Sequence, residues 1–114
     1  MRIERELMRG SGPLAVLQLL SRREMYGYEI VEALSKTTSG ALAMGQSTLY
    51  PMLYNLESKG LISSRVESGE QARVRRYYRL TALGRKELAR QRASWRVLIQ
   101  AMRALGITDP VTSR

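Results

Sequence analysis

The 114 residues carry 19 Lys and Arg against 10 Asp and Glu, a formal net charge of +9, and they include neither cysteine nor histidine. The missing residue types exclude disulfides, thiol chemistry, zinc sites of the usual Cys/His kind and catalysis by imidazole. The surplus of positive charge favours a polyanionic partner, nucleic acid before membrane, and the length favours one small folded unit.

The chain has no apolar run long enough to span a bilayer, and its start lacks the apolar segment of a signal peptide. We therefore expect a cytoplasmic protein that does not bind membranes. The carboxylates are scattered, and the sequence shows no nucleophile–base pair, Gly-rich phosphate loop or metal-ligand spacing. We expect neither an enzyme nor a bound cofactor or metal.

Two helices are predicted in the first third of the chain. The apolar run over residues 14–20 indicates a helix that is buried on most sides and begins after a break at Gly12 and Pro13. A second helix is expected over residues 26–36, where Gly27 near its start allows close packing of the backbone.

Residues 46–62 form the stretch around which the rest of the chain is organised. Apolar positions recur at the i, i+3, i+4, i+7 spacing of a core-facing helix stripe, at Leu49, Met52, Leu53, Leu56 and Gly60. The opposite side offers hydroxyls, phenols and an amide without a central carboxylate, so it can approach a polyanion and hydrogen-bond to base edges. We expect five residues to meet the DNA groove: Ser47, Thr48, Tyr50, Tyr54 and Asn55. The alternative is a solvated helix face over a core.

Three residues mark the limits of this helix. Ser47 is expected as the N-cap, with its side-chain oxygen accepting a hydrogen bond from an N–H of the first turn. Pro51 fits because it lies within or next to that turn. Gly60 is expected to end the helix.

The alternation after Gly60 predicts a β-hairpin with strands over residues 61–67 and 73–80. On the second strand the apolar face carries Val74, Tyr78 and Leu80. Arg76 shares that face by parity, so it must bend outward, pair with an acid such as Glu57 or lie beyond the edge of the core. The strand is rich in arginine and aromatic rings, which favours phosphate contacts by Arg73, Arg75 and Arg76. The alternative is an edge strand whose charge prevents aggregation.

A long final helix is expected from Thr81, its N-cap, to Gly106, its stop. A heptad seam runs along it: Leu88, Gln91, Trp95, Leu98, Met102 and Leu105. At 1.5 Å per residue the helix extends about 36 Å, which is more than this small protein can cover. We therefore expect a DNA-binding domain over residues 1–81 and a dimerisation helix with a short tail over residues 82–114, whose seam packs against a second copy.

Three segments carry a resemblance to a known family: YGYEI at residues 26–30, STLYPMLYNLESKGLI at 47–62 and RVRRYYRLTALGRKEL at 73–88. Together they resemble the signature segments of the PadR family of bacterial transcriptional regulators. The element order and the resemblance both imply a mainly α fold with a β-hairpin, a winged helix-turn-helix with a long C-terminal dimerisation helix. The resemblance further implies a homodimeric repressor whose third helix enters the major groove of double-stranded DNA at an inverted repeat.

The short region after Leu88 is similar to the small subgroup of that family, which has a single C-terminal helix. Two residues depart from the family pattern. Ser47 stands where a glycine is common before the Thr-Leu-Tyr-Pro run, and Asn55 stands where a basic residue is frequent. Both lie on the expected base-reading face, so the operator preference of relatives does not carry over.

Trp95 is the only tryptophan and lies in the middle of the seam, where a two-fold dimer would bring both copies near its axis. Either the ring fills the core of the dimer, or two indoles flank a slot for a small planar hydrophobic effector. The resemblance supports the slot, because the family includes members that respond to phenolic or other hydrophobic compounds.

Two other functions compete for the whole chain. A winged helix can serve as a protein-interaction module without DNA readout, since fold alone does not settle function. The basic final helix could also lie on a membrane surface, although its narrow seam suits a helix partner better.

Overall fold

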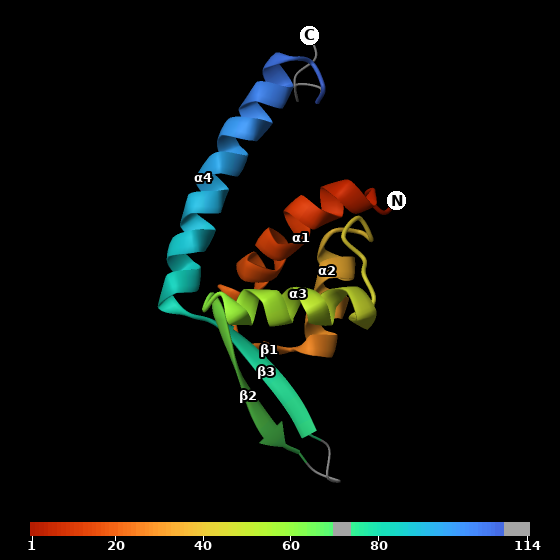
Figure 1. Cartoon of the computed structure of the whole chain (residues 1–114). Coiled ribbons are helices and arrows are strands. Elements are labelled where there is room, and N and C mark those ends of the chain that lie inside the picture. The colour runs from red at the N-terminus through yellow and green to blue at the C-terminus, as the bar shows by residue number, and fades with distance from the viewer. Residues whose placement is uncertain (70–73, 109–114) are drawn as a thin grey trace.

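The computed structural model describes residues 1–69 and 74–108. The elements are, in order, α1 (Arg5–Leu20), β1 (Met25–Tyr26), α2 (Gly27–Thr37), α3 (Gln46–Ser58), β2 (Ile62–Ser68), β3 (Val74–Leu80) and α4 (Ala82–Ala104). Three helices form the body, and the β2–β3 hairpin and α4 project from it in different directions (Figure 1). These projections make the molecule elongated, at 58 × 30 × 23 Å. The mainly helical class with a β-hairpin is confirmed.

Helix α1 contradicts the prediction, because it runs without a break through Gly12 and Pro13. Pro13 lacks the N–H of an interior helix position, which ordinarily costs about 3 kcal/mol. Packing offsets this cost. Met8, which precedes the proline in the helix, is buried. Gly12 lies against Met52 of α3, where a β-carbon would come within 2.9 Å of the Met52 Cε atom. Gly12 is therefore a contact position between helices and not a helix break.

The sheet contains a strand that the sequence pattern does not predict. The two residues of β1 pair with β3, so the strand order is β1-β3-β2 and both pairings are antiparallel. Met25 lies opposite Tyr78, and Tyr26 lies opposite Tyr77. A strand this short has no visible alternation, which is why it escapes prediction. It fixes the start of α2 at the base of the hairpin.

The core lies between α1, α2, α3 and the base of the sheet. Its fully buried side chains are Val16, Leu17, Ile30, Leu34, Leu49, Leu53 and Ile62. Of the residues expected on the apolar face of β3, Tyr78 and Leu80 are buried, but Val74 is exposed. That part of the prediction is wrong because the hairpin extends beyond the body, where no core exists to cover Val74.

Helix α4 is attached to the body through its first two turns. The Thr81 hydroxyl accepts a hydrogen bond from the Gly84 amide at 2.9 Å and lies 2.7 Å from the Gly60 carbonyl oxygen, to which it can donate. This confirms Thr81 as the N-cap, and Gly60, at φ +77°, confirms the end of α3. The last buried residue of α4 is Leu88. Among the described residues no helix, α4 included, is long and apolar enough to cross a membrane.

Candidate nucleic-acid interface

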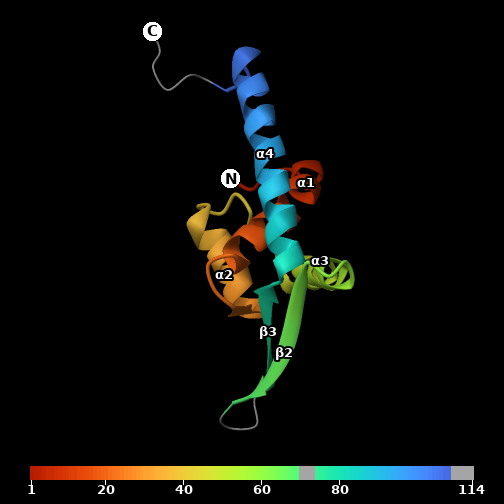
Figure 2. The ribbon, with the colours of Figure 1, turned by 90° about the vertical axis from the view of Figure 1, so that its left-hand side faces the viewer.

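Helix α3 presents its predicted outer face to solvent. Leu49, Leu53 and Leu56 are buried in the core, and the helix lies at the edge of the body, seen nearly end-on in Figure 2. All five residues expected to meet DNA are exposed on this helix: Ser47, Thr48, Tyr50, Tyr54 and Asn55. Tyr54 is the most accessible tyrosine of the helix, with 76% of its surface exposed. The fold therefore brings these residues onto one solvent-facing helix.

The expected N-cap of α3 is wrong. Gly45 occupies that position in an extended conformation, and its carbonyl oxygen accepts hydrogen bonds from the Thr48 and Leu49 amides at 3.1 and 3.0 Å. Met44 is buried in the core, so it sets the residue at which the chain enters the helix. Ser47 becomes the second helical residue, and its side chain lies on the surface instead of capping the helix.

Tyr50 is held more firmly than the other outer residues. A β-carbon at Gly27 would collide with the hydroxyl and ring of Tyr50, so the ring lies across the first turn of α2. This contact gives Gly27 the close-packing role expected from the sequence and leaves Tyr50 only 41% exposed. Tyr50 can therefore offer one edge of its ring to a ligand, whereas Tyr54 is open to solvent.

One face of the hairpin is a stack of aromatic and guanidinium groups. Tyr26 and Tyr77 meet edge to face with ring centroids 5.5 Å apart. The guanidinium carbon of Arg65 lies 4.8 Å from the Tyr77 centroid, and that of Arg75 lies 4.5 Å from the Tyr26 centroid. Each exposed cation–π contact is worth about 0.5–1 kcal/mol. The stack orients both arginines on the outer side of the sheet.

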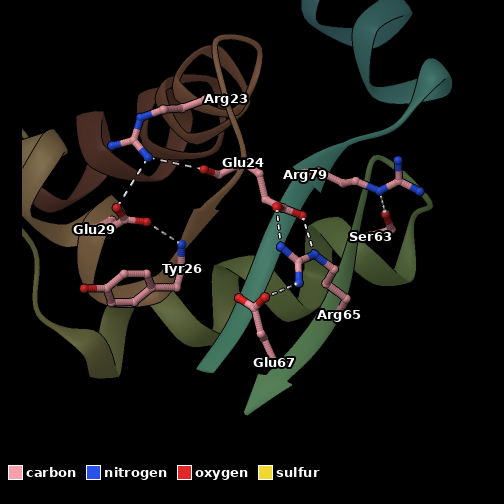
Figure 3. A network of polar contacts seen from close by, with 8 residues as sticks. All are labelled: Arg23, Glu24, Tyr26, Glu29, Ser63, Arg65, Glu67 and Arg79. Atoms are coloured by element: carbon pink, nitrogen blue, oxygen red, sulfur yellow. Dashed lines mark hydrogen bonds and ion pairs between the residues drawn. The ribbon is translucent and has the colours of Figure 1, made fainter. Parts of the chain in front are cut away.

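Arg65 is also held by acids (Figure 3). Its guanidinium donates two hydrogen bonds to the Glu24 carboxylate, at 2.9 and 2.7 Å, and lies 3.5 Å from Glu67. The hydrogen bonds from Arg65 lower the pKa of Glu24 below its ordinary value. Arg65 and Glu24 are 41 residues apart, so no sequence pattern predicts that they pair. The only sequence signal at this position is that Arg65 lies opposite Tyr77 on the hairpin. Glu24 and Glu67 partly compensate the charge of Arg65. Arg65 therefore stabilises the sheet and is not expected to be a main phosphate contact.

Arg76 lies on the opposite face of the hairpin, beside the last turn of α3. It donates a hydrogen bond to the Ser64 hydroxyl at 3.0 Å, and that hydroxyl donates to the Glu57 carboxylate at 2.7 Å. Arg76 is thus exposed beyond the core, which is one of the predicted options, and it reaches Glu57 only through the Ser64 hydroxyl and not by a direct ion pair. Arg75 and Arg76 are on different faces and do not form one cluster. Arg73 lies outside the described residues.

The seam of α4 loses cover with distance from the body. Leu88 is buried in the core of the chain itself, whereas Trp95 and Met102 are half-buried. Further along, 44% of Leu98 and 73% of Leu105 are exposed. Figure 1 shows this part of α4 standing clear of α1, α2 and α3. Apolar side chains in such a position lower the free energy of a helix only when another surface covers them.

Comparison with known proteins identifies the family. Residues 16–90 match the model of the Transcriptional regulator PadR-like family. The chain belongs to this family. The transcriptional regulator Rv3488 of Mycobacterium tuberculosis is 36% identical over 90 residues, which cover 77% of this chain and 78% of the relative.

Solved structures of PadR regulators share the fold. A PadR family regulator from Eggerthella lenta matches with a TM-score of 0.79 at 36% identity, over 91% of this chain and 88% of that one. Bacillus subtilis PadR, crystallised in complex with operator DNA, matches with a TM-score of 0.65 at 28% identity. That match covers 69% of this chain and 46% of the longer PadR chain.

Membership of the PadR-like family confirms the predicted winged-helix class. The family consists of transcriptional regulators and not of enzymes. In residues 1–69 and 74–108 no group of three or more metal-ligating side chains could hold a metal ion. Ser47 and Asn55, at which we expect a departure from the family pattern, are both exposed on α3.

Proposed function

We propose that this PadR-like protein is a cytoplasmic repressor that binds an inverted repeat in double-stranded DNA as a homodimer. The observation that carries the proposal is the exposed outer face of α3, which holds hydroxyls, phenols and an amide and lies beside the arginine-bearing hairpin. The operator complex of Bacillus subtilis PadR, a structural relative, supports DNA as the ligand. The net charge of +9 supports it independently.

The two parts of this surface have different roles in the proposal. Ser47, Thr48, Tyr54 and Asn55 meet base edges, with Tyr50 at the margin of the groove. Arg75 and Arg76, with Arg73 beyond the described residues, bind phosphates and hold the protein in register. The hydrogen bonds from Arg76 to Ser64 and from Ser64 to Glu57 connect the hairpin, which binds phosphates in this proposal, to α3, which reads bases.

The experiment is binding to the upstream region of the gene that encodes the protein, searched for an inverted repeat, and to a scrambled duplex of equal length. Tyr54→Ala and Asn55→Ala are expected to reduce discrimination between the two duplexes by about 1–3 kcal/mol for each base that is no longer read. Arg76→Ala is expected to weaken both equally and to lower the salt slope by about 0.9 for each phosphate that is no longer bound.

Two outcomes would contradict the proposal. Equal losses of affinity on both duplexes from the α3 variants would mean that this face does not read sequence. An absence of salt-sensitive binding to any duplex would favour the alternative, a winged-helix module that binds another protein.

A small planar hydrophobic effector is a second part of the proposal, supported by Trp95. Its indole is half-buried on a seam that the single chain leaves largely open. A two-fold dimer would place two such rings near its axis, and a flat apolar molecule could insert between them. An inducer must prefer a dimer geometry that binds DNA poorly, because equal affinity for both states would shift nothing.

Tryptophan fluorescence titrated with a panel of planar aromatic compounds tests this site. We expect saturable quenching that weakens when operator DNA is bound. Because Trp95 is the only tryptophan, binding to Trp95→Ala is followed by calorimetry and should be lost. Quenching that is indifferent to DNA, or its absence throughout the panel, would leave Trp95 as a packing residue of the dimer.

A further inference from the structure

The first residues of the chain lie against the start of α3. They help to form a hollow of about 190 Å³ whose lining comes from the N-terminal segment, the α2–α3 loop and the first turn of α3: Arg2, Ile3, Arg5, Met8, Ala43, Met44 and Thr48. Arg2 and Arg5 therefore line the same hollow as Thr48, one of the residues proposed to meet DNA. No role for these arginines follows from the sequence pattern.

The segment is fixed in place. The Ile3 amide donates a hydrogen bond to the Ala41 carbonyl oxygen at 3.1 Å, the Ile3 side chain packs against the core and Met8 is buried. Arg2 and Arg5 remain exposed. Two carboxylates, Glu4 and Glu6, lie on the same segment and are also exposed. In the described part of the chain no ion pair joins either arginine to a carboxylate.

A recognition helix of this composition needs cations from elsewhere. The 13 residues of α3 include no lysine or arginine. A helix that lies in the major groove is flanked by both phosphate backbones, and at 1.5 Å per residue α3 is about 20 Å long, so cations beside each of its ends can reach phosphates. The hairpin supplies Arg76 beside the last turn of α3. At the first turn, Arg2 and Arg5 line the same hollow as Thr48.

We propose that Arg2 and Arg5 bind DNA phosphates on the side of the major groove opposite to the hairpin. The N-terminal segment then forms a second attachment to the backbone, and α3 is held at both ends. This inference rests on the proposed DNA-binding function and extends it by a site outside the helix-turn-helix and the wing. Phosphate contacts of this kind set the orientation and affinity of binding without selecting sequence.

The test uses the full chain, a mixed-sequence duplex of 30 base pairs and binding measured over a range of salt concentrations. The double variant Arg2→Ala/Arg5→Ala is expected to lower the salt slope by about 0.9 for each phosphate that the protein no longer binds. Arg22→Ala/Lys36→Ala is the matched control, because it removes two exposed cations from the loop after α1 and from the end of α2. The salt slope of this control is expected to be closer to the wild-type value than that of Arg2→Ala/Arg5→Ala. Arg2→Lys/Arg5→Lys keeps the charge and should retain the slope as well.

Each result has one meaning when thermal unfolding and light scattering accompany the titration. If the wild type shows no salt-dependent binding, the proposed function itself fails. If the wild type binds and the Arg2→Ala/Arg5→Ala variant behaves like the control, the N-terminal phosphate site is overturned while DNA binding stands. If that variant becomes monomeric with an unchanged slope at saturating protein, the arginines belong to a subunit interface, which also overturns the inference. Should the alanine variant unfold, Arg2→Gln/Arg5→Gln supplies the same comparison with longer side chains.

Discussion

Single glycines set how closely the helices of this protein approach one another. Gly12 accepts Met52, Gly27 accepts Tyr50, and Gly84 in the first turn of α4 lies directly against the Leu61 carbonyl oxygen. At each position a β-carbon would meet an atom of a neighbouring element, so the role of the glycine is close packing and not backbone freedom. The Gly27 position bears on function, because Tyr50 belongs to the outer face of α3.

Gly27→Ala is expected to destabilise the protein by about 1–3 kcal/mol, the usual range for added volume in a packed site. The nearest atom to the new methyl group is the Tyr50 hydroxyl. Combining the substitution with Tyr50→Phe should therefore recover part of the stability, as measured by urea unfolding. Gly10→Ala is the control, since nothing lies within 4 Å of a β-carbon there. It should stabilise α1 by up to about 1 kcal/mol. Equal effects of the two alanine substitutions would rule out the close packing of Gly27 against Tyr50.

The carboxylate of Glu87 gives a residue-scale prediction about pH. Hydrogen bonds from Arg90, at 3.0 and 2.5 Å, and from Gln91, at 2.7 Å, lower the pKa of Glu87 to about 2. Because this pKa is below the value of about 4.3 in an unfolded chain, the stabilisation is complete above pH 4.3 and disappears as the pH falls towards 2. The amount is limited to about 0.2–1 kcal/mol by the exposure of Arg90.

Urea unfolding of the wild type and of Glu87→Gln at pH 7 and pH 2.5 measures this contribution. The wild type should be the more stable protein at pH 7, and the difference should shrink at pH 2.5. Arg90→Gln removes the partner and should show the same pH dependence. A difference that stays constant between the two pH values would mean that Glu87 acts through packing and not through its charge.

At the scale of the elements, the sequence pattern predicts those features that depend on interactions between residues close in the chain. The amphipathic stripe of α3, the hairpin and the Thr81 cap all depend on residues close in sequence, and each is present. The continuous α1 depends instead on Gly12 meeting Met52, and β1 exists only by pairing with β3. The support of Arg65 by Glu24 likewise joins distant residues. Interactions of this kind leave no periodic signal in one sequence.

The attachment of α4 gives an element-scale prediction. Thr81→Ala removes the hydrogen bond from the Gly84 amide and the interaction with the Gly60 carbonyl oxygen. We expect the free energy of unfolding to fall by about 0.5–2 kcal/mol, the range for an N-cap, in urea unfolding. Thr81→Ser keeps the hydroxyl and should retain most of the stability. If the alanine and serine variants unfold alike, the methyl group and not the cap holds α4 at this junction.

At the scale of the whole molecule, the hairpin and α4 project from one body and suit different partners. The hairpin carries exposed arginines that suit a polyanion, whereas α4 carries a largely uncovered apolar seam that suits another apolar helix. In a two-fold dimer joined through α4, the separation of the two α3 helices would follow from the length and attachment of α4. The spacing of half-sites in an inverted repeat is then a geometric property of the dimer.

The seam can be tested by two substitutions at neighbouring positions. Leu98 lies on the seam and is 44% exposed, whereas Val97 is 67% exposed and lies about 100° around the helix, away from the seam. Leu98→Glu should convert a dimer at micromolar concentration into a monomer in light scattering, because a carboxylate would be buried between apolar side chains without a partner. Val97→Glu adds the same charge on a side that faces water and should leave the dimer intact. A dimer that survives Leu98→Glu and dissociates with Val97→Glu would place the interface on another face of α4, and a wild-type monomer would remove two-half-site recognition altogether.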